Sequence, residues 1–100
     1  MSAARPRPST LLREHRAEVL ALAAANHAGD VRVFGSIARG EDTPDSDIDL
    51  LVRFESGASL FDLVRFAEKL EAMLGVHVDV LSENGLDERH QEIRDRAHAI

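Results

Sequence analysis

Three short runs rich in β-branched residues alternate with longer stretches of helical period, and this alternation allows few architectures. The runs Asp30–Phe34, Asp47–Phe54 and Val76–Leu81 have the length and residue types of strands. A helical period precedes the first run, fills residues 60–74 and continues weakly after the third run. The order α-β-(α)-β-α-β-α predicts an α/β fold with one small three-stranded sheet and flanking helices.

Local signals set the expected limits of the first helices. The first helix is predicted to begin at Ser9 or Thr10, whose hydroxyl can cap it, and to run to about Ala28. Gly29 is the expected stop, since glycine commonly follows the last helical turn. A short helical turn is predicted at Ile37–Gly40, after the first strand.

The helix over residues 60–74 has clearer ends. Ser59 with Asp62 three residues later resembles a capping box, and Gly75 suits the other end. The predicted core face follows the helical rhythm of Leu60, Leu63, Val64, Ala67, Leu70 and Leu74. Phe61, Phe66 and Met73 are candidates for a second apolar face at a chain–chain contact. A last helix is expected within Leu86–Ile100.

Composition limits the class of protein. The 100 residues are predicted to form a disordered tail over 1–8 and a single domain over 9–100. The absence of cysteine excludes disulfides, thiolate metal sites and a cysteine nucleophile. The net charge of −6 argues against direct nucleic-acid binding. No apolar stretch is long enough for a membrane span or secretion signal, so a cytoplasmic location is expected.

Three acidic residues lie where a simple solvated surface explains them poorly. Asp47 and Asp49 begin an apolar strand, and side chains two residues apart on a strand point the same way. Asp79 is an isolated acid inside a valine-rich strand. If the two strands are neighbours, these carboxylates can converge on Mg²⁺ or Mn²⁺. The alternative is solvated edge acids, and a solvated acidic loop explains the nearby Glu41, Asp42 and Asp45.

A glycine–serine pair follows the first strand. Gly35 allows close backbone approach, and the next N–H groups with the Ser36 hydroxyl can bind phosphate oxygens. Arg39, about one turn later, could add a charged contact to phosphate. The alternative is a plain strand–turn–helix connection. His77 shares a strand face with Asp79, and we interpret it as a half-buried structural histidine rather than a ligand.

These segments resemble the minimal nucleotidyltransferases of the polymerase β-like superfamily, which occur beside HEPN proteins as antitoxins of toxin–antitoxin pairs. The matching text is Val33–Gly40, Ser46–Val52 and Val78–Leu81, within a resemblance over roughly residues 10–96. The resemblance implies a mixed sheet in an α-β-α-β-α-β-α nucleotidyltransferase core.

The resemblance also implies roles for the matching residues. Asp47 and Asp49 would bind two Mg²⁺ ions, and Asp79 would bind the ion that activates the acceptor hydroxyl. These three carboxylates would be the catalytic and metal-binding residues. Gly35 and Ser36 would hold the triphosphate of ATP, and Arg39 is a family-typical residue near them.

The family activity implied is transfer of AMP from ATP to a tyrosine of the HEPN ribonuclease toxin, with release of pyrophosphate. Because only about twenty residues follow the third strand, the acceptor is expected to be recognised through this partner in a hetero-oligomer. Two alternatives stay open: an antitoxin that neutralises the toxin by binding alone, and a nucleotidyltransferase acting on a small molecule.

Overall fold

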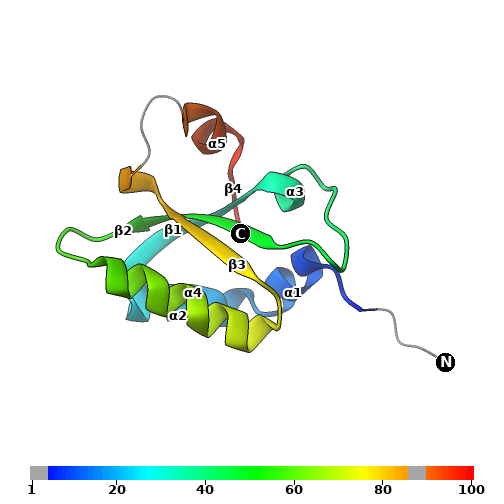
Figure 1. The fold of residues 1–100 in the computed structure, drawn as a ribbon, viewed down its shortest axis with the longest axis horizontal. Helices are drawn as coiled ribbons and strands as arrows, with labels where there is room; N and C mark the ends of the chain where they lie inside the picture. The colour runs from blue at the N-terminus through cyan, green and yellow to red at the C-terminus, as the bar shows by residue number, and fades with distance from the viewer. Residues whose placement is uncertain (1–4, 86–89) are drawn as a thin grey trace.

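A computed structural model describes residues 5–85 and 90–100 of the chain. Its elements are α1 (Pro8–Glu14), α2 (Arg16–Ala25), β1 (Ala28–Phe34), α3 (Gly35–Ala38), β2 (Ile48–Phe54), α4 (Leu60–Leu74), β3 (Val78–Ser82), the 3₁₀ turn η1 (Glu83–Gly85), α5 (Gln91–Arg96) and β4 (His98–Ala99). The predicted α/β fold with a mixed sheet and flanking helices is confirmed (Figure 1).

The sheet has the strand order β3-β2-β1-β4. β2 pairs in parallel with β3, whereas β1 is antiparallel to both β2 and β4. Figure 1 shows α2 and α4 together on one side of the sheet and α5 on the other. The parallel pair is formed through the crossover helix α4, as parallel strands require a long connection.

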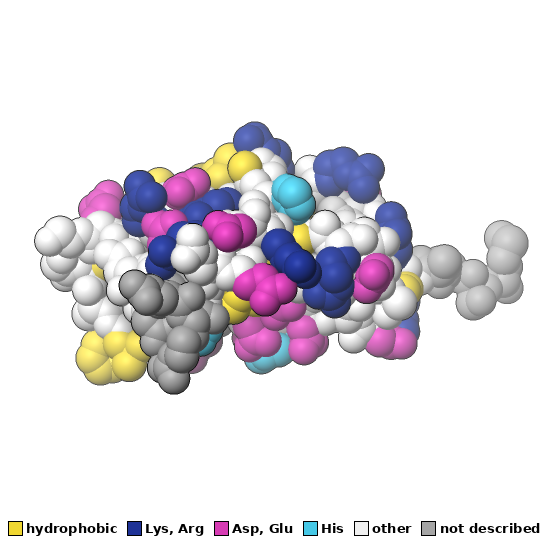
Figure 2. All heavy atoms as spheres, turned by 90° about the horizontal axis from the view of Figure 1, so that it is seen from above, with side chains coloured by type: hydrophobic (Ala, Val, Ile, Leu, Met, Phe, Trp, Pro, Cys, Tyr) yellow, Lys and Arg dark blue, Asp and Glu magenta, His cyan; other side chains and the backbone are white. Residues whose placement is uncertain are grey.

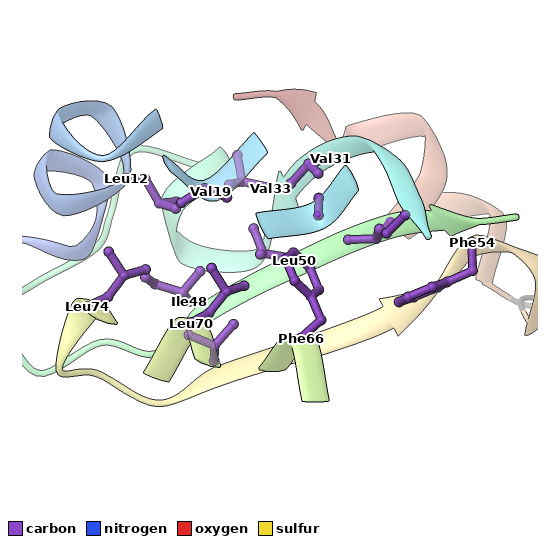
Figure 3. Packing of buried hydrophobic residues seen from close by; sticks show 14 residues of the cluster. Leu12, Val19, Val31, Val33, Ile48, Leu50, Phe54, Phe66, Leu70 and Leu74 are labelled. Carbon is purple, nitrogen blue, oxygen red and sulfur yellow. The ribbon is translucent and has the colours of Figure 1, made fainter. Parts of the chain in front are cut away.

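The core lies between the sheet and the helices α2 and α4 (Figure 3). Ile48, Leu50 and Val52 alternate along β2 and are fully buried. Phe66 and Leu70 of α4 pack against them in the same cluster. The alternate residues of β2 therefore face away from this core, toward the other side of the sheet.

The first helix differs from the prediction. The helical stretch is divided at His15 and ends at Ala25, so Gly29 lies inside β1 instead of stopping a helix. The Asn26 side-chain amide donates a hydrogen bond of 2.8 Å to the carbonyl of Leu22. His27 then has a positive φ of 62°, which ends the helical path of the backbone.

The buried face of α4 also differs from the prediction, although its ends do not. The capping box at Ser59 and the left-handed Gly75 at the other end are confirmed. Leu60 is 73% exposed, whereas Phe66 is fully buried. The prediction was wrong for both, because apolar residues lie on two sides of this helix and only its position on the sheet selects one.

The predicted last helix is present as α5, but it is short and a strand, β4, follows it. α5 and β4 occupy its end, while residues 86–89 lie outside the described residues. β4 pairs with β1 through Arg32↔Ala99 and Val33↔His98, so the sheet has a fourth strand. A two-residue strand carries no periodic signal, and the sequence could not reveal it. Among the described residues, no helix is long and apolar enough to cross a membrane.

Candidate active site

The register of the parallel strands brings two predicted acids together. Asp49 of β2 is the register partner of Asp79 of β3, so the two side chains leave the same face of the sheet. Asp47 stands just before β2, and the Ile48 N–H donates to the His77 carbonyl at 2.9 Å. The acids therefore lie at the end of the sheet where β2 and β3 begin.

Asp47 and Asp79 form a cluster with His77. One ligand atom from each of the three lies within 4.8 Å of the others. His77 Nε2 is 2.9 Å from Asp79 Oδ1, and His77 Nδ1 is 3.4 Å from Glu71 Oε1 of α4. The side chain of His77 is 54% exposed, somewhat more open than the half-buried position predicted for it, and its structural role stays a prediction. The hydrogen bond to Asp79 raises the pKa of His77, and Asp79's charge raises it further.

Asp49 lies beside this cluster and outside its ligand set. Its carboxylate contacts Gly35, where a Cβ would overlap Asp49 Oδ2. Gly35 also has a φ of 69°, so both the backbone and the space at this position require glycine. Burial raises the pKa of the Asp49 carboxyl, and the charges of Asp79 and Asp47 raise it further. The site therefore concentrates negative charge that a cation would relieve.

The predicted phosphate-binding turn forms the other side of the site. Gly35 and Ser36 begin α3 directly after β1, and the Phe34↔Asp49 pairing places this turn next to the acids. Arg39 follows α3, is 55% exposed, and donates from Nε to Glu41 at 3.1 Å. Gly35, Ser36, Arg39 and the acids thus occupy one region of the surface.

A groove runs between α3 and α5 beside this turn. Two adjoining hollows of about 350 Å³ each share Gly35, Arg39 and Arg96 in their walls. Each hollow falls in the range of ligand pockets, about 300–1,000 Å³. Arg96 pairs with Glu92 at 3.2 Å, and Figure 2 shows basic and acidic side chains next to each other on this face. Sequence reasoning missed Arg96, since no motif surrounds it.

One residue of the acidic loop is structural. Asp42 was predicted to be solvated, but it is 5% exposed and accepts a hydrogen bond of 2.9 Å from the Ser9 N–H at the start of α1. Burial opposes its ionisation, but the hydrogen bond from the Ser9 N–H and the charge of Arg7 outweigh this, so the pKa of Asp42 lies below its ordinary value. Asp42 thus joins the loop before β2 to the first helix.

The donor set fits a divalent cation. Carboxylate oxygens of Asp47 and Asp79 lie close enough to share one ion, with His77 beside them. The roles predicted for Asp47, Asp49 and Asp79 in metal binding and catalysis remain predictions. The geometry adds that Asp49 faces the glycine turn, between the other acids and the groove.

Solved structures share this fold. A candidate minimal nucleotidyltransferase aligns over 92% of this chain and 93% of its own, with a TM-score of 0.79 and 51% identity. A toxin–antitoxin structure with AMP-PNP aligns over 92% of this chain and 71% of its own, with a TM-score of 0.68. Its 19% identity shows the fold alone.

The proteins that this chain resembles in sequence are named as protein adenylyltransferases. A candidate protein adenylyltransferase of Methanocaldococcus jannaschii is 50% identical over 64% of this chain and 66% of its own length. Protein adenylyltransferase MntA of Thermococcus cleftensis is 46% identical over 57% of this chain. That match spans 58% of the relative's length, so the chain matches less than two thirds of either protein. The nucleotidyltransferase domain family matches residues 12–99, which confirms the resemblance seen in the sequence, and the chain belongs to this family.

Proposed function

We propose that this chain is an antitoxin that acts as a Mg²⁺- and ATP-dependent protein adenylyltransferase. It transfers AMP to a tyrosine of a partner HEPN ribonuclease toxin and releases pyrophosphate. The observation that carries the proposal is the meeting of Asp47, Asp49 and Asp79 beside the Gly35 turn in a nucleotidyltransferase frame. The names of the relatives and of the toxin–antitoxin structure with AMP-PNP support the substrate class and the kind of partner.

The reaction forms one bond and breaks one. The tyrosine oxygen attacks the α-phosphorus of ATP, and the bond from this phosphorus to the oxygen bridging the α- and β-phosphates breaks. The hydroxyl proton passes to the Asp79 carboxylate or to solvent, and pyrophosphate carries away the negative charge. Mg²⁺, when bound, neutralises the phosphate charge that would otherwise repel the three carboxylates.

The groove between α3 and α5 is the proposed place of the nucleotide. The N–H groups after Gly35 and the Ser36 hydroxyl would bind phosphate oxygens at the groove wall. Arg39 and Arg96 flank the same groove. Their present partners, Glu41 and Glu92, are exposed, and such surface pairs hold weakly enough for phosphate to replace them.

The test is label transfer from ATP that carries the label on its α-phosphate. The chain is incubated with Mg²⁺ and the protein encoded by the adjacent gene. We expect label on that protein, and loss of label when its acceptor tyrosine is changed to phenylalanine. The variant Asp47→Asn with Asp49→Asn should transfer at least about 100-fold more slowly, the scale on which electrostatic groups contribute to catalysis.

The matched control is Asp45→Asn. Asp45 lies in the same acidic loop and its side chain is 79% exposed, but it pairs with Arg5 away from the cluster. It should leave the rate unchanged. If the two chains bind each other and no label is transferred, the adenylyltransferase proposal is wrong.

Neutralisation by binding alone is the second candidate. It is favoured by the exposed apolar side chains Leu60, Phe61 and Val64 on one side of α4, which offer a surface for a partner. Leu60→Ser with Phe61→Ser would then abolish neutralisation, whereas Asp47→Asn with Asp49→Asn would not. Growth of cells that express toxin and variant at matched levels separates the two candidates.

A further inference from the structure

The histidine in the acidic cluster points to a particular class of cation. We propose that His77 Nε2 is a metal ligand together with Asp47 and Asp79, and that the site therefore prefers Mn²⁺ to Mg²⁺. The proposal rests on the proposed function, because that function requires a divalent ion here. It adds which ion the donors select and which residue makes the selection.

The distances suit one shared ion. Octahedral ligands about 2.1 Å from an ion stand about 3.0 Å apart when adjacent and about 4.2 Å apart when opposite. His77 Nε2–H donates to Asp79 Oδ1 at 2.9 Å, and an ion that displaces this proton would find the two atoms at the spacing of adjacent ligands. With Asp47, all three donor atoms lie within 4.8 Å of one another. Small side-chain movements bring these exposed groups around a single cation.

Glu71 supplies the orientation that a histidine ligand needs. Its Oε1 lies 3.4 Å from His77 Nδ1, on the side of the ring opposite Nε2. When an ion displaces the proton that Nε2 donates to Asp79, Nδ1–H still faces the Glu71 carboxylate and the lone pair on Nε2 becomes available to the cation. Metal-binding histidines usually present their other nitrogen to a carboxylate or carbonyl in this way. Glu71 comes from α4 and His77 from the segment before β3, so the crossover helix brings the pair together.

The nitrogen donor determines the preference. Mg²⁺ takes oxygen ligands and keeps several waters, whereas first-row transition ions also accept imidazole. A site of three carboxylates would treat Mg²⁺ and Mn²⁺ similarly. Replacing one donor by imidazole favours Mn²⁺, and the effect should disappear when His77 is changed.

The experiment uses the full chain without nucleotide and with Mn²⁺ alone. Electron paramagnetic resonance of free Mn²⁺ gives the affinity of the chain for Mn²⁺. Displacement of bound Mn²⁺ by added Mg²⁺ gives its affinity for Mg²⁺. Pulsed resonance on bound Mn²⁺ detects coupling to an imidazole nitrogen, which reports ligation directly. The variants are His77→Asn and Glu71→Ala, with circular dichroism to check folding.

Two matched controls are available. His27→Asn changes a histidine that is also exposed and beside a carboxylate, Glu55. Asparagine also tolerates the positive φ of 62° at that position. Glu68→Ala changes an exposed glutamate on the same helix as Glu71. Both controls should bind Mn²⁺ like the unchanged chain.

We expect nitrogen coupling in the unchanged chain and its loss in His77→Asn. Because groups that orient a ligand are worth about 10–100-fold in metal affinity, Glu71→Ala should weaken Mn²⁺ binding about tenfold and His77→Asn at least as much. Mg²⁺ affinity should change far less. Absence of nitrogen coupling, or an equal loss of Mn²⁺ and Mg²⁺ binding in His77→Asn, would overturn the proposal.

This result is independent of AMP transfer. Nitrogen coupling without label transfer to a bound partner would reject the adenylyltransferase and retain the His77 site. Label transfer that Mg²⁺ and Mn²⁺ support equally, with no nitrogen coupling, would retain the enzyme and reject the His77 site.

Discussion

Two charged regions lie on the same face of the sheet, at opposite ends of β2. Asp49 marks one and Arg53 the other, four residues or about 13 Å apart along the strand. At the Arg53 end, Glu83 accepts hydrogen bonds from Arg53 Nε at 2.9 Å and from Arg32 Nη1 at 3.0 Å. Asp30 lies 3.5 Å from Arg32 and completes this region.

The two regions differ in how their charges are balanced. At the arginine end, hydrogen bonds from Arg53 and Arg32 hold the pKa of Glu83 below its ordinary value. At the acidic end, burial and like charges raise the pKa of Asp49. The first region thus stabilises the fold, whereas the second costs stability. Natural proteins keep such unfavourable groups mostly where function needs them.

Asp49→Asn should separate function from stability most strongly. Removing this carboxylate should lower AMP transfer at least about 100-fold, the scale of a lost electrostatic contribution to catalysis. The melting temperature should rise at the same time, because the half-buried charge and its repulsion from Asp79 are gone. Label transfer and thermal unfolding measure the two effects. A lower melting temperature would show that other groups of the folded chain already offset the negative charge of Asp49.

Glu83→Gln should have the opposite profile. It removes the charge of a carboxylate that accepts hydrogen bonds from both Arg53 and Arg32, and the Arg32 side chain is only 12% exposed, so the free energy of unfolding should fall by about 1–3 kcal/mol. AMP transfer by the folded protein should be unchanged. Urea unfolding followed by circular dichroism gives the stability. Unchanged stability would mean that this region is not structural.

Gly35→Ala against Gly40→Ala tests how closely the acidic region is packed. Both glycines have φ near 70°, so alanine should cost about 1–2 kcal/mol of backbone strain at either position. Among residues 5–85 and 90–100, nothing lies within 4 Å of a Cβ at Gly40, whereas a Cβ at Gly35 overlaps Asp49. Gly35→Ala should therefore lose more stability in urea unfolding. Equal losses of stability would show that the Asp49 side chain moves away from the added Cβ at no cost in free energy.

The pH dependence of stability should differ in sign between the regions. Glu83 has a lowered pKa, so its stabilisation is full above its ordinary 4.5 and is lost as the pH falls through the folded value. Asp49 has a raised pKa, so its cost is absent below its ordinary 3.8 and appears as the pH rises through the folded value. Melting curves of Glu83→Gln and Asp49→Asn should differ from the unchanged chain most near about pH 7 and converge in acid.

Local patterns were sufficient for the elements that carry strong signals. The strand centred on Leu51, the capping box at Ser59 and the stop at Gly75 follow from neighbouring residues, and the structure has all three. The spacing of Asp47 and Asp49, with Asp79 on a valine-rich strand, pointed to one face of adjacent strands. The register Asp49↔Asp79 places the latter two side by side.

Other features depend on contacts between distant segments. Which side of α4 is buried, the burial of Asp42 under Ser9 and the fourth strand all require partners far away in the chain. The same holds for the site: Glu71 beside His77 and Arg96 across from Arg39 come from separate elements. The sequence by itself determined the first three strands, the ends of α4 and the acids, because these depend on period and local chemistry. Only the tertiary structure decided which side chains meet, because packing chooses among faces that the residues alone leave equivalent.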